Sequence, residues 1–120
     1  MKKIVKLGLL VLLLCACSSK KVTKYENIDT NRALEIIEDG ATIIDVRTVE
    51  EYNTGHIVNA INIPLDEITT IDIPKDNTLI IYCASGIRST KAINELINLG
   101  YTSLYNLDGG LINWGLELEE

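Results

Sequence analysis

The 120-residue sequence contains no phenylalanine, one tryptophan and one histidine, and aromatic residues make up only 5% of it. A folded core must therefore be built mainly from isoleucine and leucine, and a chain of this length holds one ordinary domain. No group of His, Cys and Asp residues has the spacing of metal ligands. We accordingly predict neither a metal nor another cofactor.

The N-terminal stretch has the pattern of an export signal. Residues 1–3 carry two lysines, and residues 4–14 are almost wholly apolar but fewer than the ~20 needed for a typical membrane-spanning helix. The segment ending at Cys17 resembles a bacterial lipobox, which implies cleavage before Cys17 and its lipidation. Cys15 fits less well because Leu14, rather than a small residue, precedes it. An ordinary signal peptide or an uncleaved anchor is the alternative.

These features predict a signal peptide at residues 1–16, a lipidated cysteine with a polar tether at 17–24, and one domain at 25–120. Loss of the signal removes three lysines and no acid, which leaves 8 basic against 17 acidic residues and a net charge of −9. An acidic domain is repelled by nucleic acid and by anionic lipid headgroups. We therefore expect no nucleic-acid partner, and an exported protein anchored through its lipid to the bacterial cell membrane, or to the outer membrane where there are two.

Cysteine is scarce as well. With Cys15 in the predicted signal and Cys17 as the predicted lipid site, Cys83 is the only thiol of the domain. A disulfide within the domain is thereby excluded, although an exported compartment would permit one. An unpaired cysteine outside the cytoplasm is a liability unless it is buried or used. Cys83 is therefore the first candidate for a functional residue.

From residue 25 onward, short apolar runs alternate with helical periodicity. A helix is expected from Thr30, as its cap, to Gly40, and the apolar run at 78–82 favours a central strand that is covered on both faces. Such alternation is typical of an α/β domain with a mainly parallel sheet. Further strands are predicted at 42–46, 60–63 and 103–107, and further helices at 49–53, 88–99 and around Trp114.

Cys83 follows the predicted central strand at its carboxyl end, where α/β sheets bind their ligands. The chain then turns at Gly86 and enters a helix, so that backbone N–H groups and the helix N-terminus favour negative charge there. A cysteine at this point has a stabilised thiolate. Arg88 can bind an oxyanion such as thiosulfate, and Ser89 can donate a further hydrogen bond. The predicted site comprises catalytic Cys83 and the substrate-binding residues Ala84, Ser85, Gly86, Ile87, Arg88 and Ser89.

The same loop and its flanking segments resemble the single-domain rhodaneses. The resemblance spans roughly residues 25–114 and implies a rhodanese-like fold, with about five strands in the sheet and helices on both of its faces. The matching motifs, in chain order, are Asp45-Val46-Arg47, Glu51-Tyr52, Gly55-His56-Ile57, Ala60-Ile61-Asn62-Ile63-Pro64, Tyr82-Cys83, Gly86-Ile87-Arg88-Ser89, Gly100-Tyr101, Asn106-Leu107, Gly109-Gly110-Leu111 and Trp114.

This resemblance implies a sulfurtransferase. Cys83 would take sulfur from an anionic donor such as thiosulfate, or from a persulfide, and pass it to an acceptor, which is cyanide in an assay and a small or protein thiol in the cell. Two positions depart from the family pattern. Asn59 stands where glycine is common, and the loop has no basic residue between Cys83 and Arg88, so thiosulfate itself is expected to be a poor donor.

Three further polar residues are expected to be structural. Asp45 and Arg47 are expected near the Cys83 loop, as a structural ion pair rather than as pocket residues. His56 is expected to be structural rather than a general base.

The enzymatic alternative is a cysteine phosphatase or an arsenate reductase. These enzymes have five residues between Cys and Arg, whereas four separate Cys83 from Arg88, and this difference counts against them. The remaining alternative is a non-catalytic rhodanese-like module that binds a partner or senses persulfides.

Overall fold

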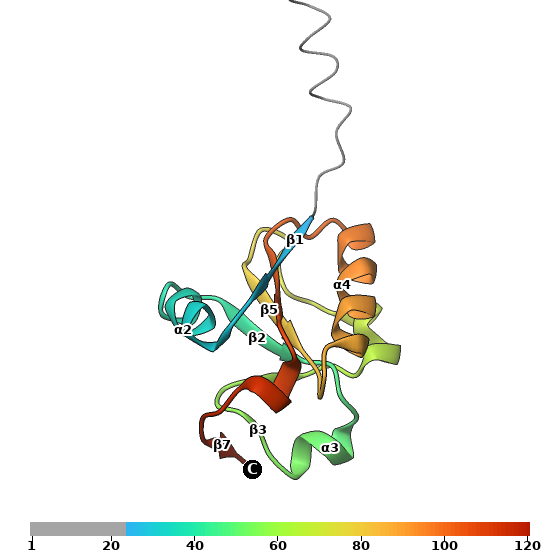
Figure 1. Cartoon of the computed structure of the whole chain (residues 1–120). Coiled ribbons are helices and arrows are strands. Elements are labelled where there is room, and N and C mark those ends of the chain that lie inside the picture. The colour runs from blue at the N-terminus through green and yellow to red at the C-terminus, as the bar shows by residue number, and fades with distance from the viewer. Residues whose placement is uncertain (1–23) are drawn as a thin grey trace, which may run out of the picture.

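A computed structural model describes residues 24–120 (Figure 1). The predicted signal peptide and the predicted lipidation site at Cys17 lie outside the described residues. Within the described part, no helix combines the length and the apolar character needed to cross a membrane.

The centre of the fold is a five-stranded sheet in which every neighbouring pair of strands is parallel. The α/β fold predicted from the sequence is thereby confirmed. The strand predicted to be central, β5 (Leu79–Tyr82), lies in the middle of the sheet with all four residues buried. The strands in spatial order are β1 (Tyr25–Ile28), β6 (Leu104–Leu107), β5, β2 (Thr42–Asp45) and β4 (Ile61–Asn62).

Alternate residues of the strands point to opposite faces and bury two separate apolar clusters, with helices covering both faces (Figure 1). On one face, Ile44 and Ile81 pack with α4 (Ile87–Leu99) and the 3₁₀ helix η1 (Leu65–Thr70). Each fully buried side chain of this size contributes about 1.5–3 kcal/mol. The other face packs against α2 (Thr30–Glu38), with a cluster that includes Ile36, Ile43, Ile80, Tyr82, Leu107 and Trp114.

The cap of α2 differs from the prediction. Asp29 is the N-cap, and its carboxylate accepts the backbone N–H of Arg32 at 2.9 Å, so the prediction that Thr30 caps this helix was wrong. Both residue types are good caps, and the extended backbone of Asp29 decides between them. Thr30 is instead the first helical residue, and its hydroxyl donates to the carbonyl of Trp114 at 3.0 Å.

Several short elements had no counterpart in the prediction. They include β1, η1, and a small antiparallel pair formed by β3 (His56–Ile57) and β7 (Leu118–Glu119). The predicted final helix is a 3₁₀ turn, η2 (Gly110–Asn113), which Trp114 follows. The predicted helix at 49–53 is present as α3 (Val49–Asn53).

Candidate active site

Cys83 directly follows β5 at the carboxyl edge of the sheet and belongs to the apolar cluster beneath α4. Its residue is only 1% exposed, so the sulfur lies at the base of the loop rather than on its surface. The loop runs from Cys83 to Gly86, where the chain adopts φ +109, and α4 begins at Ile87. The predicted position of the thiol at the carboxyl end of the central strand is therefore what the structure has.

The loop aims its hydrogen-bond donors at the sulfur atom. The backbone N–H groups of Gly86 and Ser89 donate to Cys83 Sγ at 3.0 and 3.3 Å. Burial by itself raises the pKa of the Cys83 thiol, but the hydrogen bonds from the Ser89 side chain and from the backbone of Ser89, Gly86 and Ser85 outweigh it, and the pKa is lowered overall. The site therefore favours a thiolate.

Ser89 has a second role in the same loop. Its hydroxyl lies 3.6 Å from Cys83 Sγ and donates to the carbonyl of Gly86 at 3.0 Å. A hydroxyl has a single proton, so in this arrangement the thiol donates to Ser89 Oγ. When Cys83 ionises, the Ser89 proton must turn from the carbonyl to the sulfur to stabilise the thiolate.

The segment that follows β6 is hydrogen-bonded to the backbone of the Cys83 loop. Backbone N–H groups of Leu111 and Ile112 donate to the carbonyls of Cys83 and Ala84, at 3.0 and 3.2 Å. Gly110 permits this contact, because it has φ +62 and a Cβ there would lie 2.4 Å from the Cys83 carbonyl oxygen. The pair of glycines in the C-terminal motif thus has a direct connection to the loop.

The guanidinium of Arg88 is paired with a carboxylate. Its two terminal nitrogens donate to the two carboxylate oxygens of Glu51 at 2.7 and 3.0 Å. The hydrogen bonds from Arg88 and from the Thr48 backbone lower the pKa of Glu51 to about 2, so it is ionised at neutral pH. The role of Arg88 in holding an anionic donor remains a prediction.

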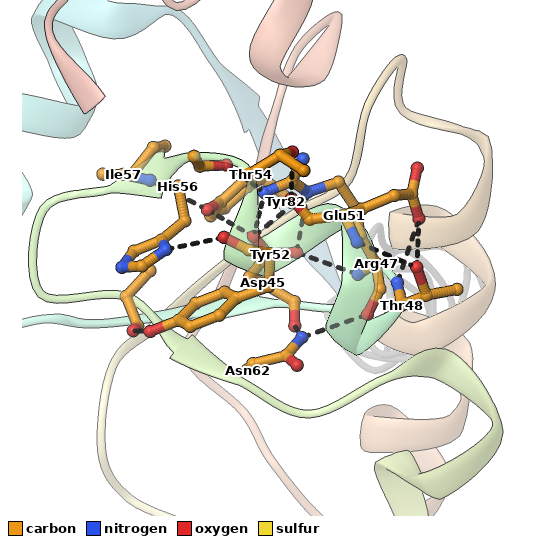
Figure 2. A network of polar contacts seen from close by, with 12 residues as sticks. Asp45, Arg47, Thr48, Glu51, Tyr52, Thr54, His56, Ile57, Asn62 and Tyr82 are labelled. Carbon is orange, nitrogen blue, oxygen red and sulfur yellow. Dashed lines mark hydrogen bonds and ion pairs between the residues drawn. The ribbon is translucent and has the colours of Figure 1, made fainter. Parts of the chain in front are cut away.

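Asp45 and Arg47 form a buried cluster with Tyr82 at the same edge of the sheet (Figure 2). Asp45 accepts the Tyr82 hydroxyl at 2.6 Å and the guanidinium of Arg47 at 2.7 to 3.1 Å, while Arg47 also donates to the Gly55 carbonyl at 2.7 Å. Burial lowers the pKa of Arg47, but its hydrogen bond and charge interaction with Asp45 raise it more. The Tyr82 hydroxyl in turn accepts the N–H of Ile57 at 3.0 Å.

This cluster connects the sheet to α3 rather than to the sulfur. Tyr82 and Asp45 are register partners in adjacent strands, on the face covered by α2, whereas Cys83 lies on the α4 face. Arg47 donates a hydrogen bond to the carbonyl of Gly55, which lies just beyond the end of α3, the helix that contains Glu51. The hydrogen bonds of Asp45 and Arg47 thus lead toward α3, whose Glu51 pairs with Arg88, and do not reach the sulfur.

His56, the single histidine, is engaged elsewhere. Its Nδ1 lies 2.9 Å from the carbonyl of Tyr52, its ring stacks on that tyrosine with centroids 3.6 Å apart, and its Nε2 lies 3.3 Å from Glu119. Both ring nitrogens thus have partners away from Cys83. Among residues 24–120, no three His, Cys, Asp or Glu side chains are grouped so as to hold a metal ion.

With this geometry in place, comparison with known proteins identifies the family. The family model described as "Rhodanese-like domain" matches residues 29–117. The chain belongs to the rhodanese-like domain family. A protein named sulfurtransferase from Allochromatium vinosum is 36% identical over 95 residues, which cover 78% of this chain and 88% of the relative. Thiosulfate sulfurtransferase 18 of Arabidopsis thaliana is 32% identical over 114 residues, covering 81% and 83%.

Solved structures agree with this assignment. A rhodanese-related protein from Thermoplasma volcanium superposes with a TM-score of 0.71 at 31% identity, covering 79% of this chain and 98% of that one. A rhodanese-like domain protein from Staphylococcus aureus gives 0.70 at 35% identity, covering 78% and 96%. The rhodanese-like fold predicted from the motifs is confirmed, and the relatives support a sulfurtransferase-like enzyme.

Two contributors to the site of this rhodanese-like domain were missed in the sequence. Glu51 was noted only as part of a motif, although the Thr48-to-Glu51 spacing is that of a capping box, which the structure contains. That signal predicts the start of a helix but not the partner of Glu51, which lies 37 residues away. Gly110 was likewise noted only as part of a motif, and only the folded structure shows that it packs against the Cys83 backbone.

Proposed function

We propose that this protein is a sulfurtransferase that carries sulfane sulfur as a persulfide on Cys83. The observation that supports the proposal most is the convergence of the Gly86 and Ser89 N–H groups on Cys83 Sγ. Donors arranged in advance around a developing negative charge stabilise it without any reorganisation. Donors that already converge on Sγ suit the thiolate that begins the reaction and is regenerated at its end.

The first half-reaction is a displacement at sulfur. The Cys83 thiolate attacks the outer sulfur of the donor, a bond forms between Sγ and that sulfur, and the donor's own sulfur–sulfur bond breaks. The leaving group takes the electron pair, and it is sulfite when the donor is thiosulfate or a thiolate when the donor is a persulfide. No external oxidant or reductant is needed.

The second half-reaction returns the enzyme to its starting state. An acceptor nucleophile attacks the outer sulfur of the Cys83 persulfide and leaves with it, as thiocyanate from cyanide or as a new persulfide from a thiol. The acceptor must come from outside the domain, because Cys83 is the only cysteine in residues 24–120. The bond to Sγ breaks, and the thiolate is regenerated in its ring of donors.

Sulfur loading and turnover test this proposal separately. The full chain is incubated with thiosulfate or with a thiol persulfide, and its mass is measured before and after cyanide is added. We expect a gain of one sulfur atom on Cys83, its loss to cyanide, and formation of thiocyanate. Cys83→Ser should abolish the gain while leaving the circular dichroism spectrum unchanged.

The outcome also decides the alternative of a non-catalytic module. A wild-type chain that gains no cyanide-labile sulfur, or a Cys83→Ser chain that transfers as well as wild type, would exclude the sulfurtransferase. A chain that loads but does not pass its sulfur to cyanide or thiols would be a persulfide-binding module. The control is Thr90→Ala in the first turn of α4, whose hydroxyl donates to the Ile87 carbonyl at 2.9 Å rather than to the sulfur, and it should load and transfer sulfur as wild type does.

We further propose that the chain is exported and anchored through a lipid on Cys17. The support is the sequence pattern of residues 1–17, with its basic start, apolar run and lipobox-like end. Labelling of cells that express the full chain with a radioactive fatty acid should mark the wild type and leave Cys17→Ala unlabelled. Equal labelling of both chains would contradict the anchor without affecting the proposed chemistry.

A further inference from the structure

Arg88 is the only charged residue between Cys83 and Ser89, and its guanidinium is already paired with a carboxylate. Both of its terminal nitrogens donate to Glu51, one to each carboxylate oxygen. This bidentate contact uses the edge of the guanidinium formed by its two terminal nitrogens, which could otherwise bind an oxyanion in the same way. An anionic donor therefore has to compete with Glu51 for this cation.

Glu51 is held in place for this contact by its own helix. The backbone N–H and the hydroxyl of Thr48 both lie within hydrogen-bond distance of Glu51 Oε1, at 3.0 and 3.1 Å, and the same oxygen accepts from Arg88. These contacts keep the carboxylate ionised and reduce the entropy it loses by pairing. The pair thus neutralises Arg88 at neutral pH.

The exposed side chains next to the loop include two isoleucines. Ile87, the first residue of α4, is 67% exposed, and Ile112, whose backbone N–H donates to the loop carbonyl of Ala84, is 75% exposed. The other arginine at this edge of the sheet, Arg47, is buried against Asp45. Arg88, whose side chain is 34% exposed, is therefore the arginine at this edge that a donor anion can reach.

We infer that Glu51 is a specificity-determining residue, which by holding Arg88 makes the site select persulfide donors of low charge over the dianion thiosulfate. This inference rests on the proposed sulfurtransferase function. With thiosulfate, two negative charges approach the Cys83 thiolate, and sulfite leaves with two. With a thiol hydropersulfide, the attacked sulfur carries no net charge, and the leaving thiolate carries only one.

The test compares the two donors on one enzyme. We measure kcat/KM of the full chain for thiosulfate and for cysteine persulfide, with cyanide as the acceptor, in wild type and in Glu51→Gln. Release of Arg88 should raise the ratio of thiosulfate to persulfide kcat/KM by about 2- to 5-fold, mainly through a lower KM for thiosulfate. The gain should disappear in the double variant Glu51→Gln with Arg88→Ala.

The matched control removes one carboxylate from another arginine pair. Glu35 pairs with Arg32 at 3.0 Å on α2, which covers the opposite face of the sheet from Cys83, so Glu35→Gln makes the same change in net charge away from the loop. Its donor ratio should match wild type. If Glu35→Gln raises the ratio as much as Glu51→Gln, the effect is one of overall charge and the inference is wrong.

A merely structural role for Glu51 predicts a different result. In that case the kcat/KM values for both donors change in parallel, their ratio stays at its wild-type value, and the inference is overturned.

A second variant tests the inference even if Glu51→Gln does not fold. Ile87→Lys adds a cation that Glu51 does not hold at a largely exposed position, and it should also raise the ratio, while an unchanged ratio there counts against the inference.

Failure of the proposed function would look different from failure of this inference. If neither donor loads sulfur onto wild-type Cys83, the sulfurtransferase proposal falls, and the role of Glu51 falls with it. If the wild type loads from a persulfide and the variants keep its donor ratio, only the role of Glu51 is refuted.

Discussion

Two polar clusters lie at the same edge of the sheet and use the same groups in different ways. The Asp45 cluster is buried, and its ion pair with Arg47 has side chains only 0% and 6% exposed. The ion pair of the Cys83 loop joins Glu51 to Arg88, with side chains 37% and 34% exposed. Both pairs are arginine–carboxylate contacts of 2.7 Å, and burial is what separates them.

The difference indicates which pair is structural and which can respond to a ligand. Breaking a buried pair leaves an uncompensated charge in a low-dielectric surrounding, so the fold strongly resists it. A half-exposed pair is screened by water and contributes little, so its partners can be exchanged at low cost. The first cluster therefore fixes the position of α3, and the second leaves Arg88 open to competition.

The largest effect is expected from Asp45→Ala. This change leaves Arg47 buried without its carboxylate, and the free energy of unfolding should fall by about 3–5 kcal/mol. Urea unfolding followed by circular dichroism measures it. Glu35→Ala, on an exposed pair, is the control and should stay close to wild type. A loss from Asp45→Ala as small as that of the control would remove the distinction between the two clusters.

Tyr82→Phe should have the next largest effect on stability. The hydroxyl donates to Asp45 and accepts from the Ile57 N–H, so its removal leaves a buried N–H without its partner. We expect a loss of about 1–3 kcal/mol in the same unfolding assay. Tyr105→Phe, on a half-buried side chain of β6, is the matched control. Equal losses from both would show that the hydroxyl of Tyr82 adds nothing specific.

Ser89→Ala should affect reactivity more than stability. Because the Ser89 hydroxyl helps to lower the pKa of Cys83, its loss should raise that pKa relative to wild type. A lowered pKa places the thiolate at lower pH, so the alkylation rate with iodoacetamide should rise at higher pH in Ser89→Ala than in wild type. Thr90→Ala is the control, and identical pH profiles for all three chains would contradict the role of Ser89.

The same pKa shift has a consequence for stability. The pKa of Cys83 is lower in the folded chain than in the unfolded one, so ionisation stabilises the fold fully above the unfolded pKa. That contribution is lost as the pH falls through the folded pKa. In Ser89→Ala the two pKa values lie closer together, and the gain in stability on raising the pH through this window should be smaller.

The smallest effect on stability is expected from Glu51→Gln. Its pair with Arg88 is more than one third exposed, and screening limits the loss to at most about 1 kcal/mol. Raising the ionic strength should shrink even this difference. A loss as large as that of Asp45→Ala would show that both pairs are structural, and would place the two clusters in one class.

The elements with strong local patterns could be predicted from the sequence. The apolar run at 78–82 indicated the central strand, and the thiol that follows it was expected at the carboxyl edge of the sheet, as the structure has it. Asn59 was noted where glycine is common, and it has φ +70, a conformation that asparagine tolerates better than most residues. In each case the cause lies within a few residues of the effect.

Contacts between distant segments could not be predicted in this way. Nothing in the local pattern pairs β3 with β7, because two-residue strands have no periodicity to detect. The choice of Asp29 over Thr30 as a helix cap depended on backbone angles that neither residue type determines alone. The roles of Asp45 and Arg47 were anticipated as structural, but their attachment to Tyr82 and Gly55 was not.

The sequence by itself determined where the candidate nucleophile lies: a single thiol in the domain, placed after the most apolar strand and before a glycine turn and a helix. Local sequence is sufficient there, because the donors to the sulfur come from the residues that directly follow it. Only the tertiary structure decided the electrostatics. Folding brings Glu51 against Arg88 across 37 residues, and it neutralises the cation that the motif alone presents as free.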